Sequence, residues 1–251
     1  MEQTAAHACP VCGNPADLYD VVNFNKSCME AEGLHLALAG VPIYYRRCGA
    51  CEYTWAPEFR QWSDSDFLNH IYNEGYVDVD PDYLSTRPQL NAQMVTQLFG
   101  KERGRIRHLD YGGGNGGLSA LLAQQDWNTA SFDPFPGDGT TAESLGKFNL
   151  ITSFEVFEHV PDPDALMANL RILMDEECLV LFSTVASDGS ILPNGRLTWW
   201  YASPRNGHIS LFSTRSLALL AERHGLHFRS FNLTTHCFYN VMPAWAGLAG
   251  T

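Results

Sequence analysis

A glycine-rich turn at residues 112–117 has a composition suited to holding a small ligand. Four of its first five residues are glycine, and Asp110 lies two residues before the first of them. Glycine lets the chain turn tightly, so backbone N–H groups and the start of a following helix can approach a ligand with no side chain between them. The same glycines also fit a tight turn that binds nothing and only requires positive φ. The turn is therefore a candidate cofactor site, with Gly112, Gly114 and Gly116 as its candidate contacts.

The spacing of these glycines distinguishes between two classes of cofactor. A dinucleotide site carries G-x-G-x-x-G, whereas Gly112, Gly114 and Gly116 follow G-x-G-x-G. The turn contains no basic residue, so a pyrophosphate would have no charged partner within it. The pattern therefore favours a cofactor other than a dinucleotide.

An acidic residue and an aromatic residue follow the next predicted strand. Residues 129–132 have a strand-like composition and end at Asp133, about twenty residues beyond the glycine turn. A carboxylate at that place suits the two hydroxyls of a ribose. Phe135 is a candidate to stack on an adenine, and Pro134 lies between the two. The remaining cofactor-binding candidates are Asp110, Tyr111, Phe154 and Glu155.

Two histidines and two tyrosines have positions suited to proton transfer. His208 precedes a predicted capped helix, and His159 follows the predicted strand that carries Glu155. A histidine titrates near neutral pH, which suits a general base. Tyr72 and Tyr76 bracket a predicted flexible turn, so either phenol is a candidate to reach a substrate or to stabilise an oxyanion. The alternatives are histidines that orient loops and tyrosines that only pack.

Four cysteines near the N-terminus have the spacing of a metal site. Cys9 and Cys12 form one C-x-x-C pair, and Cys48 and Cys51 form another. Each pair can place two thiolates on one tetrahedral metal ion, and four thiolates leave no open coordination position. Strand-like segments between the pairs resemble those of a zinc ribbon, so we expect a structural zinc ion. A redox-active pair and disulfides are the alternatives.

The remaining patterns predict alternating strands and helices that would position these residues. A strand at residues 106–111 leads into the glycine turn and a helix, and residues 148–161 predict a buried strand followed by a polar loop. A helix at 162–174 and a buried strand at 177–185 follow. Residues 134–147 leave room for only a short helical segment, so we expect the sheet to lack one strand there. The fold class is therefore α/β.

The patterns divide the chain into three predicted parts. Residues 1–60 contain the cysteine pairs and form a zinc-ribbon-like domain, and residues 61–100 form a helical lid or linker. Residues 101–251 contain the glycine turn and form the cofactor-binding domain.

Two segments resemble motifs of class I S-adenosylmethionine-dependent methyltransferases. The first is Asp110-Tyr-Gly-Gly-Gly-Asn-Gly116, and the second is 148–159, which ends in a Glu-His pair and has Asn149 in place of the usual aspartate. The resemblance covers roughly residues 85–240. It implies a Rossmann-like sheet, S-adenosyl-L-methionine as cofactor, a glycine turn around the methionine part and the second-strand acid on the ribose. It also implies that the helices before the first core strand form a lid.

The chain further resembles the zinc-containing deoxysugar C-methyltransferases and related small-molecule methyltransferases. These enzymes share paired N-terminal cysteines, a tyrosine-bearing segment and an H-x-x-x-F-S pattern, which His208 to Ser213 match. The resemblance implies that His208 is the base. Gly207 stands where the sugar enzymes carry glutamate. The sequence ends near the expected end of the methyltransferase core, whereas those enzymes continue into another domain. We therefore expect a small-molecule acceptor, either a sugar nucleotide or a biosynthetic intermediate, methylated at C, O or N.

The charge and composition of the chain favour some of the competing functions over others. The chain has a formal net charge of −12 with 16 Lys+Arg, which argues against broad contact with a nucleic-acid backbone. The alternative functions are a zinc-containing RNA methyltransferase, against which this charge argues, and a partner-binding fold without catalysis. No segment has the pattern of a membrane span or a signal peptide, so we expect a cytoplasmic protein. We expect the zinc ribbon to shape the acceptor pocket, contact a second copy in a homodimer, or dock a carrier or partner protein.

Overall fold

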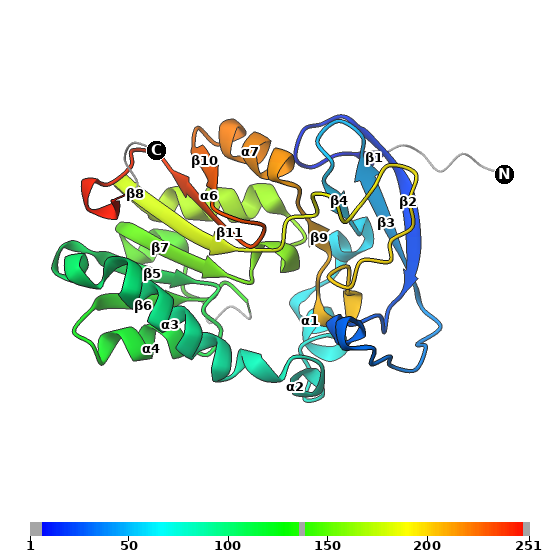
Figure 1. Ribbon diagram of the computed structural model, residues 1–251, viewed down its shortest axis with the longest axis horizontal. Helices are drawn as coiled ribbons and strands as arrows, with labels where there is room; N and C mark the ends of the chain where they lie inside the picture. The colour runs from blue at the N-terminus through cyan, green and yellow to red at the C-terminus, as the bar shows by residue number, and fades with distance from the viewer. Residues whose placement is uncertain (1–6, 136–138, 248–251) are drawn as a thin grey trace. The chain divides into compact units, whose positions relative to one another are not determined.

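A six-stranded mixed sheet forms the core of one of two compact units in this computed structural model, which describes residues 7–135 and 139–247. The strand order is β10-β11-β8-β7-β5-β6 (Figure 1). The central strands β6, β5, β7 and β8 run parallel, whereas β11 and β10 extend the sheet antiparallel beyond β8. The strands are β5 (Arg107–Tyr111), β6 (Asn128–Phe132), β7 (Phe148–Phe154), β8 (Met174–Ser183), β10 (His227–Ser230) and β11 (Thr235–Tyr239).

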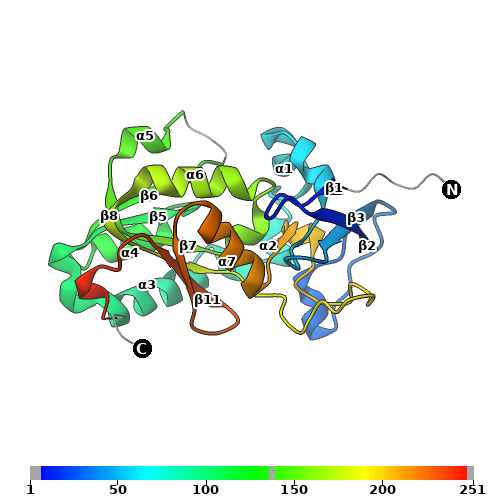
Figure 2. The same cartoon turned by 90° about the horizontal axis from the view of Figure 1, so that it is seen from above.

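Helices cover both faces of this sheet. Figure 2 shows α3 (Thr86–Phe99) and α4 (Gly117–Ala123) on one side of the strands and α6 (Pro163–Leu173) on the other. The apolar residues of α3 and α4 recur at helical spacing, so each helix buries one face in a shared core with β7 and β8. The principal core residues are Ala92, Val95, Phe99, Leu118, Leu122, Leu150 and Leu181. The shorter elements are α5 (Ala142–Leu145) and the 3-10 segments at Pro81–Tyr83, Gly100–Arg105 and Ala244–Ala246.

The sheet has the shortened side that the sequence predicts. Among the described residues, β6 is the edge strand, and the connection from β6 to β7 contains only the four-residue helix α5. Residues 136–138 of that connection lie outside the described residues. The parallel order of β6, β5, β7 and β8 confirms the expected Rossmann-like α/β arrangement.

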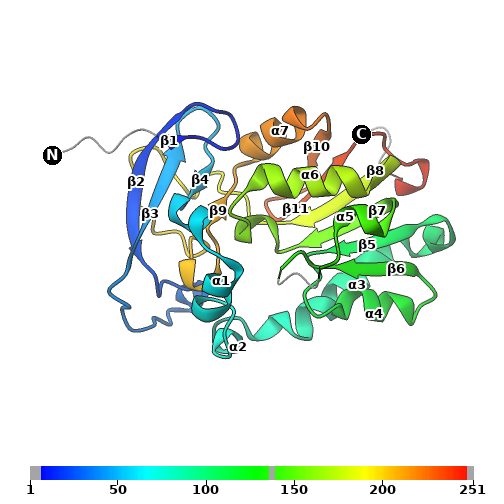
Figure 3. The same cartoon turned by 180° about the vertical axis from the view of Figure 1, so that it is seen from behind.

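The second unit is built on a five-stranded antiparallel sheet of order β1-β2-β3-β4-β9. Figure 3 shows β2 and β3 as its long strands. The strands are β1 (His7–Ala8), β2 (Pro15–Asn23), β3 (Pro42–Cys48), β4 (Thr54–Trp55) and β9 (Ser210–Leu211). The helices are α1 (Asp64–His70), α2 (Tyr76–Val79) and α7 (Thr214–Arg223), with 3-10 segments at Cys28–Glu32, Pro57–Gln61, Phe157–His159 and Pro204–Asn206.

The division into units differs from the predicted parts 1–60, 61–100 and 101–251. Residues 157–164 and 185–220 group with residues up to 80, because β9 pairs with β4 and completes the antiparallel sheet. The lid segment is likewise divided, since α3 packs on the mixed sheet whereas α1 and α2 belong to the antiparallel unit. No helix in the described part of the chain has the length and apolar character needed to cross a membrane.

Candidate functional site

The glycine turn lies directly after β5 and has no space for side chains at two positions. A Cβ added to Gly112, whose φ is +73°, would lie 2.4 Å from Cγ2 of Val156. A Cβ added to Gly113 would lie 2.3 Å from Oγ of Ser131 and 2.7 Å from Oδ2 of Asp110. Gly114 also has positive φ, but a Cβ there would meet nothing within 4 Å. The turn is therefore packed closely against the sheet on its inner side and open at Gly114.

Asp133 is tied to the glycine turn by its side chain. Its Oδ2 accepts a hydrogen bond of 2.8 Å from the backbone N–H of Gly114, and its Oδ1 accepts one of 2.9 Å from the N–H of Phe135. Burial raises the pKa of Asp133, and these two backbone hydrogen bonds oppose the increase. The structure thus brings together the two features that the sequence predicts for cofactor binding, although they lie on different strands.

A buried polar chain lies beneath the turn. Oδ1 of Asp110 accepts a hydrogen bond of 2.9 Å from the Thr152 hydroxyl, whose Oγ1 lies 2.9 Å from Nε2 of His108. Since Thr152 donates its proton to Asp110, His108 donates from Nε2 and accepts at Nδ1 from the Thr129 hydroxyl, 2.7 Å away. Burial raises the pKa of Asp110 to about 7 and lowers that of His108 to about 3. Asp110 therefore supports the turn from below.

The residue after β7 is held in an uncommon backbone conformation. Glu155 has a φ of 53°, a region that residues other than glycine seldom occupy. Its Oε1 accepts a hydrogen bond of 2.7 Å from the Ser183 hydroxyl, and its N–H donates to Oγ of Ser183 at 2.9 Å. The ends of β7 and β8 are thus locked together, and strain of this kind is frequent at functional sites.

Four other cofactor candidates have less direct positions. The Tyr111 side chain is buried, and its hydroxyl accepts a hydrogen bond of 3.2 Å from Nδ2 of Asn169. Phe154 is buried in the core beneath α3 and α4, so its side chain serves packing. Pro134 is exposed and Phe135 is half-buried. Of these four, Phe135 keeps an aromatic face for which a stacking role remains a prediction.

The four N-terminal cysteines form one cluster in the antiparallel unit. Sγ of Cys9 lies 3.5 Å from that of Cys51, and Sγ of Cys12 lies 3.4 Å from that of Cys48. All four sulfur atoms lie within 4.8 Å of one another. A tetrahedral zinc site has Zn–S distances of about 2.3 Å and hence sulfur atoms about 3.8 Å apart, so the cluster has the dimensions for one zinc ion.

Both cysteine pairs sit in turns of the same design. The N–H of Gly13 donates to the carbonyl of Cys9 at 2.8 Å, and the N–H of Glu52 donates to the carbonyl of Cys48 at 2.8 Å. Gly13 and Glu52 both have positive φ, 75° and 66°. The hydrogen bond from Cys51 lowers the pKa of Cys9 to about 6, which favours the thiolate form that a metal ion requires.

The two candidate histidines lie together in the antiparallel unit. Their rings meet edge to face with centroids 4.9 Å apart, and the Tyr72 hydroxyl lies 3.1 Å from Nδ1 of His159. His208 is buried, with 6% of its surface exposed, whereas His159 is half-buried. One nitrogen of each ring and one carboxylate oxygen of Glu158 lie within 4.8 Å of one another. The structure therefore forms a compact acid–base cluster from residues that are distant in the sequence.

Tyr76 has a different environment from Tyr72. Its hydroxyl lies 3.3 Å from Oδ2 of Asp80 and 3.4 Å from the carbonyl of Asn206, and the side chain is buried. These contacts favour the packing interpretation for Tyr76. Tyr72 keeps the candidate role because it is half-buried and contacts His159.

The backbone conformation and the surroundings of Gly207 account for the absence of a glutamate at this position. It has a φ of +86°, and a Cβ there would lie 2.9 Å from Nδ1 of His159 and 2.9 Å from the Tyr72 hydroxyl. A glutamate at this position would therefore require both an unfavourable backbone and the space that Tyr72 and His159 occupy.

Several residues of these clusters were not candidates from the sequence. Thr152 and Ser131 face the glycine turn from neighbouring strands, while Glu158 and Tyr201 join the histidines. The Glu-His pair at the end of the second motif was the one sequence feature that pointed to Glu158. The contact of Tyr201 depends on a loop, so no local pattern indicated it.

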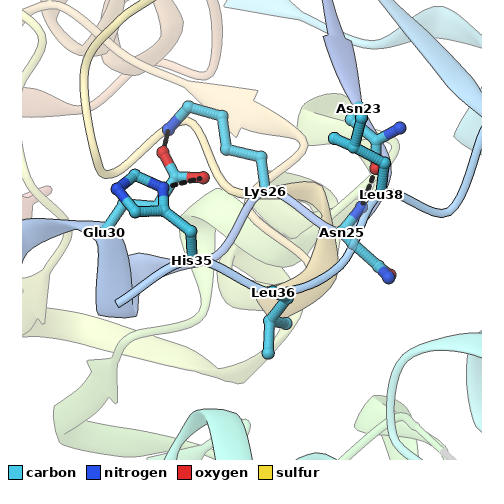
Figure 4. Close-up of a pocket in the computed structure, with 7 residues that line it drawn as sticks. All are labelled: Asn23, Asn25, Lys26, Glu30, His35, Leu36 and Leu38. Carbon is cyan, nitrogen blue, oxygen red and sulfur yellow. Dashed lines mark hydrogen bonds and ion pairs between the residues drawn. The ribbon is translucent and has the colours of Figure 1, made fainter. Parts of the chain in front are cut away.

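A small hollow of about 200 Å³ lies elsewhere in the antiparallel unit (Figure 4). Lys26 forms an ion pair of 3.4 Å with Glu30, and Nδ1 of His35 lies 3.6 Å from the same carboxylate. The Lys26 ammonium also donates to the carbonyl of Trp199 at 2.8 Å. The charged groups around this hollow therefore pair with one another. None of the predicted site residues lines the hollow.

Comparison with known proteins assigns a part of the chain that contains five of the six strands of the mixed sheet, from β5 to β10. A family model described as a methyltransferase domain matches residues 83–230. The ubiquinone biosynthesis O-methyltransferase of Bordetella avium (strain 197N) is 27% identical in an alignment 119 residues long, and this alignment covers 38% of this chain and 49% of that protein. The chain thus spans about half the length of this curated relative.

One solved structure has a similar fold over most of its length. It is the 1,6-didemethyltoxoflavin-N1-methyltransferase of Burkholderia thailandensis, crystallised with 1,6-didemethyltoxoflavin and S-adenosylhomocysteine. The TM-score is 0.52 at 16% sequence identity, and the match covers 83% of this chain and 99% of that one.

Proposed function

Because the chain belongs to the methyltransferase domain family, we propose that it transfers the methyl group of S-adenosyl-L-methionine to a small-molecule acceptor. The observation that carries this proposal is the closely packed glycine turn with Asp133 bonded to the Gly114 N–H. The turn has the open face and the acid that such a cofactor needs.

The residues present fit this cofactor. The backbone of the turn at Gly114 and Gly116, which is open at Gly114, would hold its methionine part. The Asp133 carboxylate would accept hydrogen bonds from the ribose hydroxyls. Phe135 would stack on the adenine, and the Glu155 carboxylate would contact the cofactor's amino group. Asp110 would act from beneath the turn by keeping its shape, since its carboxylate is buried and bonded to Thr152. When bound, the cofactor supplies a methyl group already activated on a sulfonium.

The protein's remaining task is to remove a proton from the acceptor, which we assign to the histidine pair. As the acceptor atom forms its bond to the methyl carbon, the S–CH₃ bond breaks with its electron pair left on sulfur, and the acceptor proton passes to an imidazole nitrogen. His159 is more exposed than His208 and is the better candidate to contact the acceptor. The Tyr72 hydroxyl lies next to Nδ1 of His159.

The small-molecule assignment is supported by the relatives and by the net charge of the chain. One relative is a ubiquinone biosynthesis O-methyltransferase, and the other is an N1-methyltransferase whose crystal structure contains 1,6-didemethyltoxoflavin. The net charge of −12 opposes binding to a nucleic-acid backbone. We therefore propose a sugar nucleotide or a biosynthetic intermediate as acceptor, methylated at C, O or N.

We further propose that the cysteine cluster binds a structural zinc ion. Four thiol ligands with nearly tetrahedral spacing leave no position for a substrate. All seven cysteines are free thiols, so none of the four is engaged in a disulfide bond. Measuring the oligomeric state with and without zinc would show whether this unit also serves as a homodimer contact, and binding to a carrier protein would show a docking role.

The first experiment is to follow transfer of label from methyl-labelled S-adenosyl-L-methionine into an extract of the native host. The extract is separated into small molecules, RNA and protein after the reaction. Label in the small-molecule fraction would support the proposal and identify the acceptor by its mass. Label in RNA would contradict the charge argument and support an RNA methyltransferase. A variant with Asp133→Ala is the control for transfer that depends on this protein.

A further inference from the structure

The cluster of His159 and His208 contains the carboxylate of Glu158, although Gly207 stands where the sugar enzymes carry glutamate. Gly207 has no side chain, and its position lacks space for one beside His159 and Tyr72. Glu158 is nevertheless within 4.8 Å of a ring nitrogen of His208. Its side chain is fully buried, and its carbonyl accepts a hydrogen bond of 2.9 Å from the N–H of Ile209. The backbone therefore holds Glu158 next to the segment that carries His208.

The Glu158 carboxylate is connected to Tyr201 by a short hydrogen bond. The Tyr201 hydroxyl donates to Oε1 of Glu158 at 2.5 Å. The same hydroxyl accepts from the backbone N–H of Val185 at 3.2 Å. Because this hydroxyl accepts the Val185 N–H, its own proton points to Glu158, and Oε1 of Glu158 acts as an acceptor.

Tyr201 in turn holds His208. Nδ1 of His208 lies 2.9 Å from the carbonyl oxygen of Tyr201, and the two rings have centroids 4.2 Å apart. Because a carbonyl only accepts hydrogen bonds, Nδ1 of His208 carries a proton, and Nε2 is the atom that can take up another. The Tyr45 hydroxyl donates to the carbonyl of His208 at 2.7 Å, which holds the backbone of that residue.

We propose that Glu158 and Tyr201 are positioning residues for His208, which fix its tautomer and stabilise its protonated form. The inference rests on the proposed function, because it concerns the histidine pair assigned to proton removal. Glu158 thus takes the place of the acid that Gly207 does not supply, because its carboxylate lies within 4.8 Å of a His208 ring nitrogen. The Tyr201 hydroxyl holds that carboxylate, and the Tyr201 main-chain carbonyl accepts from the His208 ring.

The other titratable groups around His208 do not supply this charge. Cys28 lies with Sγ 3.7 Å from Nδ1 of His208, and burial raises the pKa of its thiol to about 12, so it stays neutral. His159 would repel a protonated His208 if both rings were charged. Tyr72 and Tyr45 contribute hydroxyl groups that are neutral near pH 7. Glu158 therefore carries the carboxylate that lies next to both histidine rings.

The test is a titration of the histidine rings by ¹⁵N NMR, which needs neither acceptor nor methyl transfer. Glu158→Gln keeps the size and the hydrogen-bond acceptor of the side chain and removes its charge. We expect the titration midpoint of the His208 ring to fall by about one pH unit or more in this variant. His208→Asn and His159→Asn assign the two resonances, and Glu176→Gln, at an exposed glutamate, is the matched control.

A second readout tests whether the Tyr201 hydroxyl positions the Glu158 carboxylate, since Tyr201→Phe removes that hydroxyl and leaves the carbonyl next to His208 in place. Turnover is measured against pH for Glu158→Gln, Tyr201→Phe and the double variant, with Tyr44→Phe at an exposed tyrosine as control. We expect the acid limb of the profile to move in both single variants and the double variant to resemble Glu158→Gln.

Three results would overturn the proposal. They are an unchanged His208 midpoint in a folded Glu158→Gln protein, fully additive effects in the double variant, and a bound metal ion beyond the cysteine site that His208→Asn removes. The last would make the cluster a metal site. A failure of the proposed function is distinguishable, because the protein would then show the NMR shift without transferring a methyl group.

Discussion

Oδ2 of Asp133 accepts a hydrogen bond of 2.8 Å from the backbone N–H of Gly114. This contact joins the acid after β6 to the open position of the turn after β5. The affinity for cofactor should therefore depend strongly on Asp133.

We expect Asp133→Ala to weaken binding of S-adenosylhomocysteine about 10- to 100-fold, the loss of a charge-assisted hydrogen bond. Isothermal titration calorimetry measures this directly. Asp126→Asn, at an exposed position after α4, should bind normally. Unchanged affinity in Asp133→Ala would refute the ribose assignment.

Gly113 should tolerate no side chain. In Gly113→Ala the new Cβ would lie 2.3 Å from Oγ of Ser131 and 2.7 Å from Oδ2 of Asp110, so the turn must shift. We expect a loss of about 1–3 kcal/mol in the free energy of unfolding and weaker cofactor binding. Urea denaturation and calorimetry check both. Gly104→Ala is the control, because a Cβ there meets nothing within 4 Å.

The ionisation of Asp110 should make stability fall as the pH rises. Its folded pKa is about 7, well above the usual value of 3.8, so between these values the folded state binds more protons than the unfolded state. Stability then decreases with pH across that interval, by a few kcal/mol at most. His108, whose pKa burial lowers to about 3, acts in the opposite sense below pH 6.5.

Comparison with Asp110→Asn isolates this effect, because the contribution of His108 is common to both proteins. The free energy of unfolding is measured by urea denaturation at several values between pH 5 and pH 8. We expect the difference between variant and wild type to shift in favour of the variant as the pH rises. A constant difference would show that Asp110 ionises normally.

Removal of the metal should destabilise the cysteine cluster. We expect about one zinc ion per chain by elemental analysis, and a lower melting temperature after chelation, because metal binding contributes folding free energy. Cys51→Ser should lose the zinc. Cys178→Ala removes a buried cysteine outside the cluster and should keep it. A preparation without metal that melts at the same temperature would contradict the structural role.

Replacement of the histidines should affect turnover more than cofactor binding. We expect His159→Asn to lower kcat about 100- to 10,000-fold, the usual contribution of a general base, with the affinity for S-adenosylhomocysteine retained. His224→Asn, at another histidine, is the matched control. Full turnover in both His159→Asn and His208→Asn would place proton removal elsewhere.

The sequence by itself determined the elements whose information is local. Glycines at 112–116 require a tight turn because other residues disfavour positive φ. The apolar patterns predicted the helix after the glycine turn and the helix at 162–174, which are α4 and α6. The short connection after Asp133 predicted that a strand is lacking between β6 and β7, and none lies in the described part of that connection. The cysteine spacing likewise predicted a four-sulfur cluster, since each C-x-x-C turn brings two sulfurs together.

The tertiary structure alone decided which polar side chains meet. Thr152 lies beneath the glycine turn because β7 pairs with β5 in one register. Residues 185–220 join the antiparallel unit because the two-residue strand β9 pairs with β4. Tyr201, Glu158 and His208 contact one another in this same antiparallel unit. Contacts between residues far apart in the chain depend on strand register and loop packing, which no local pattern encodes.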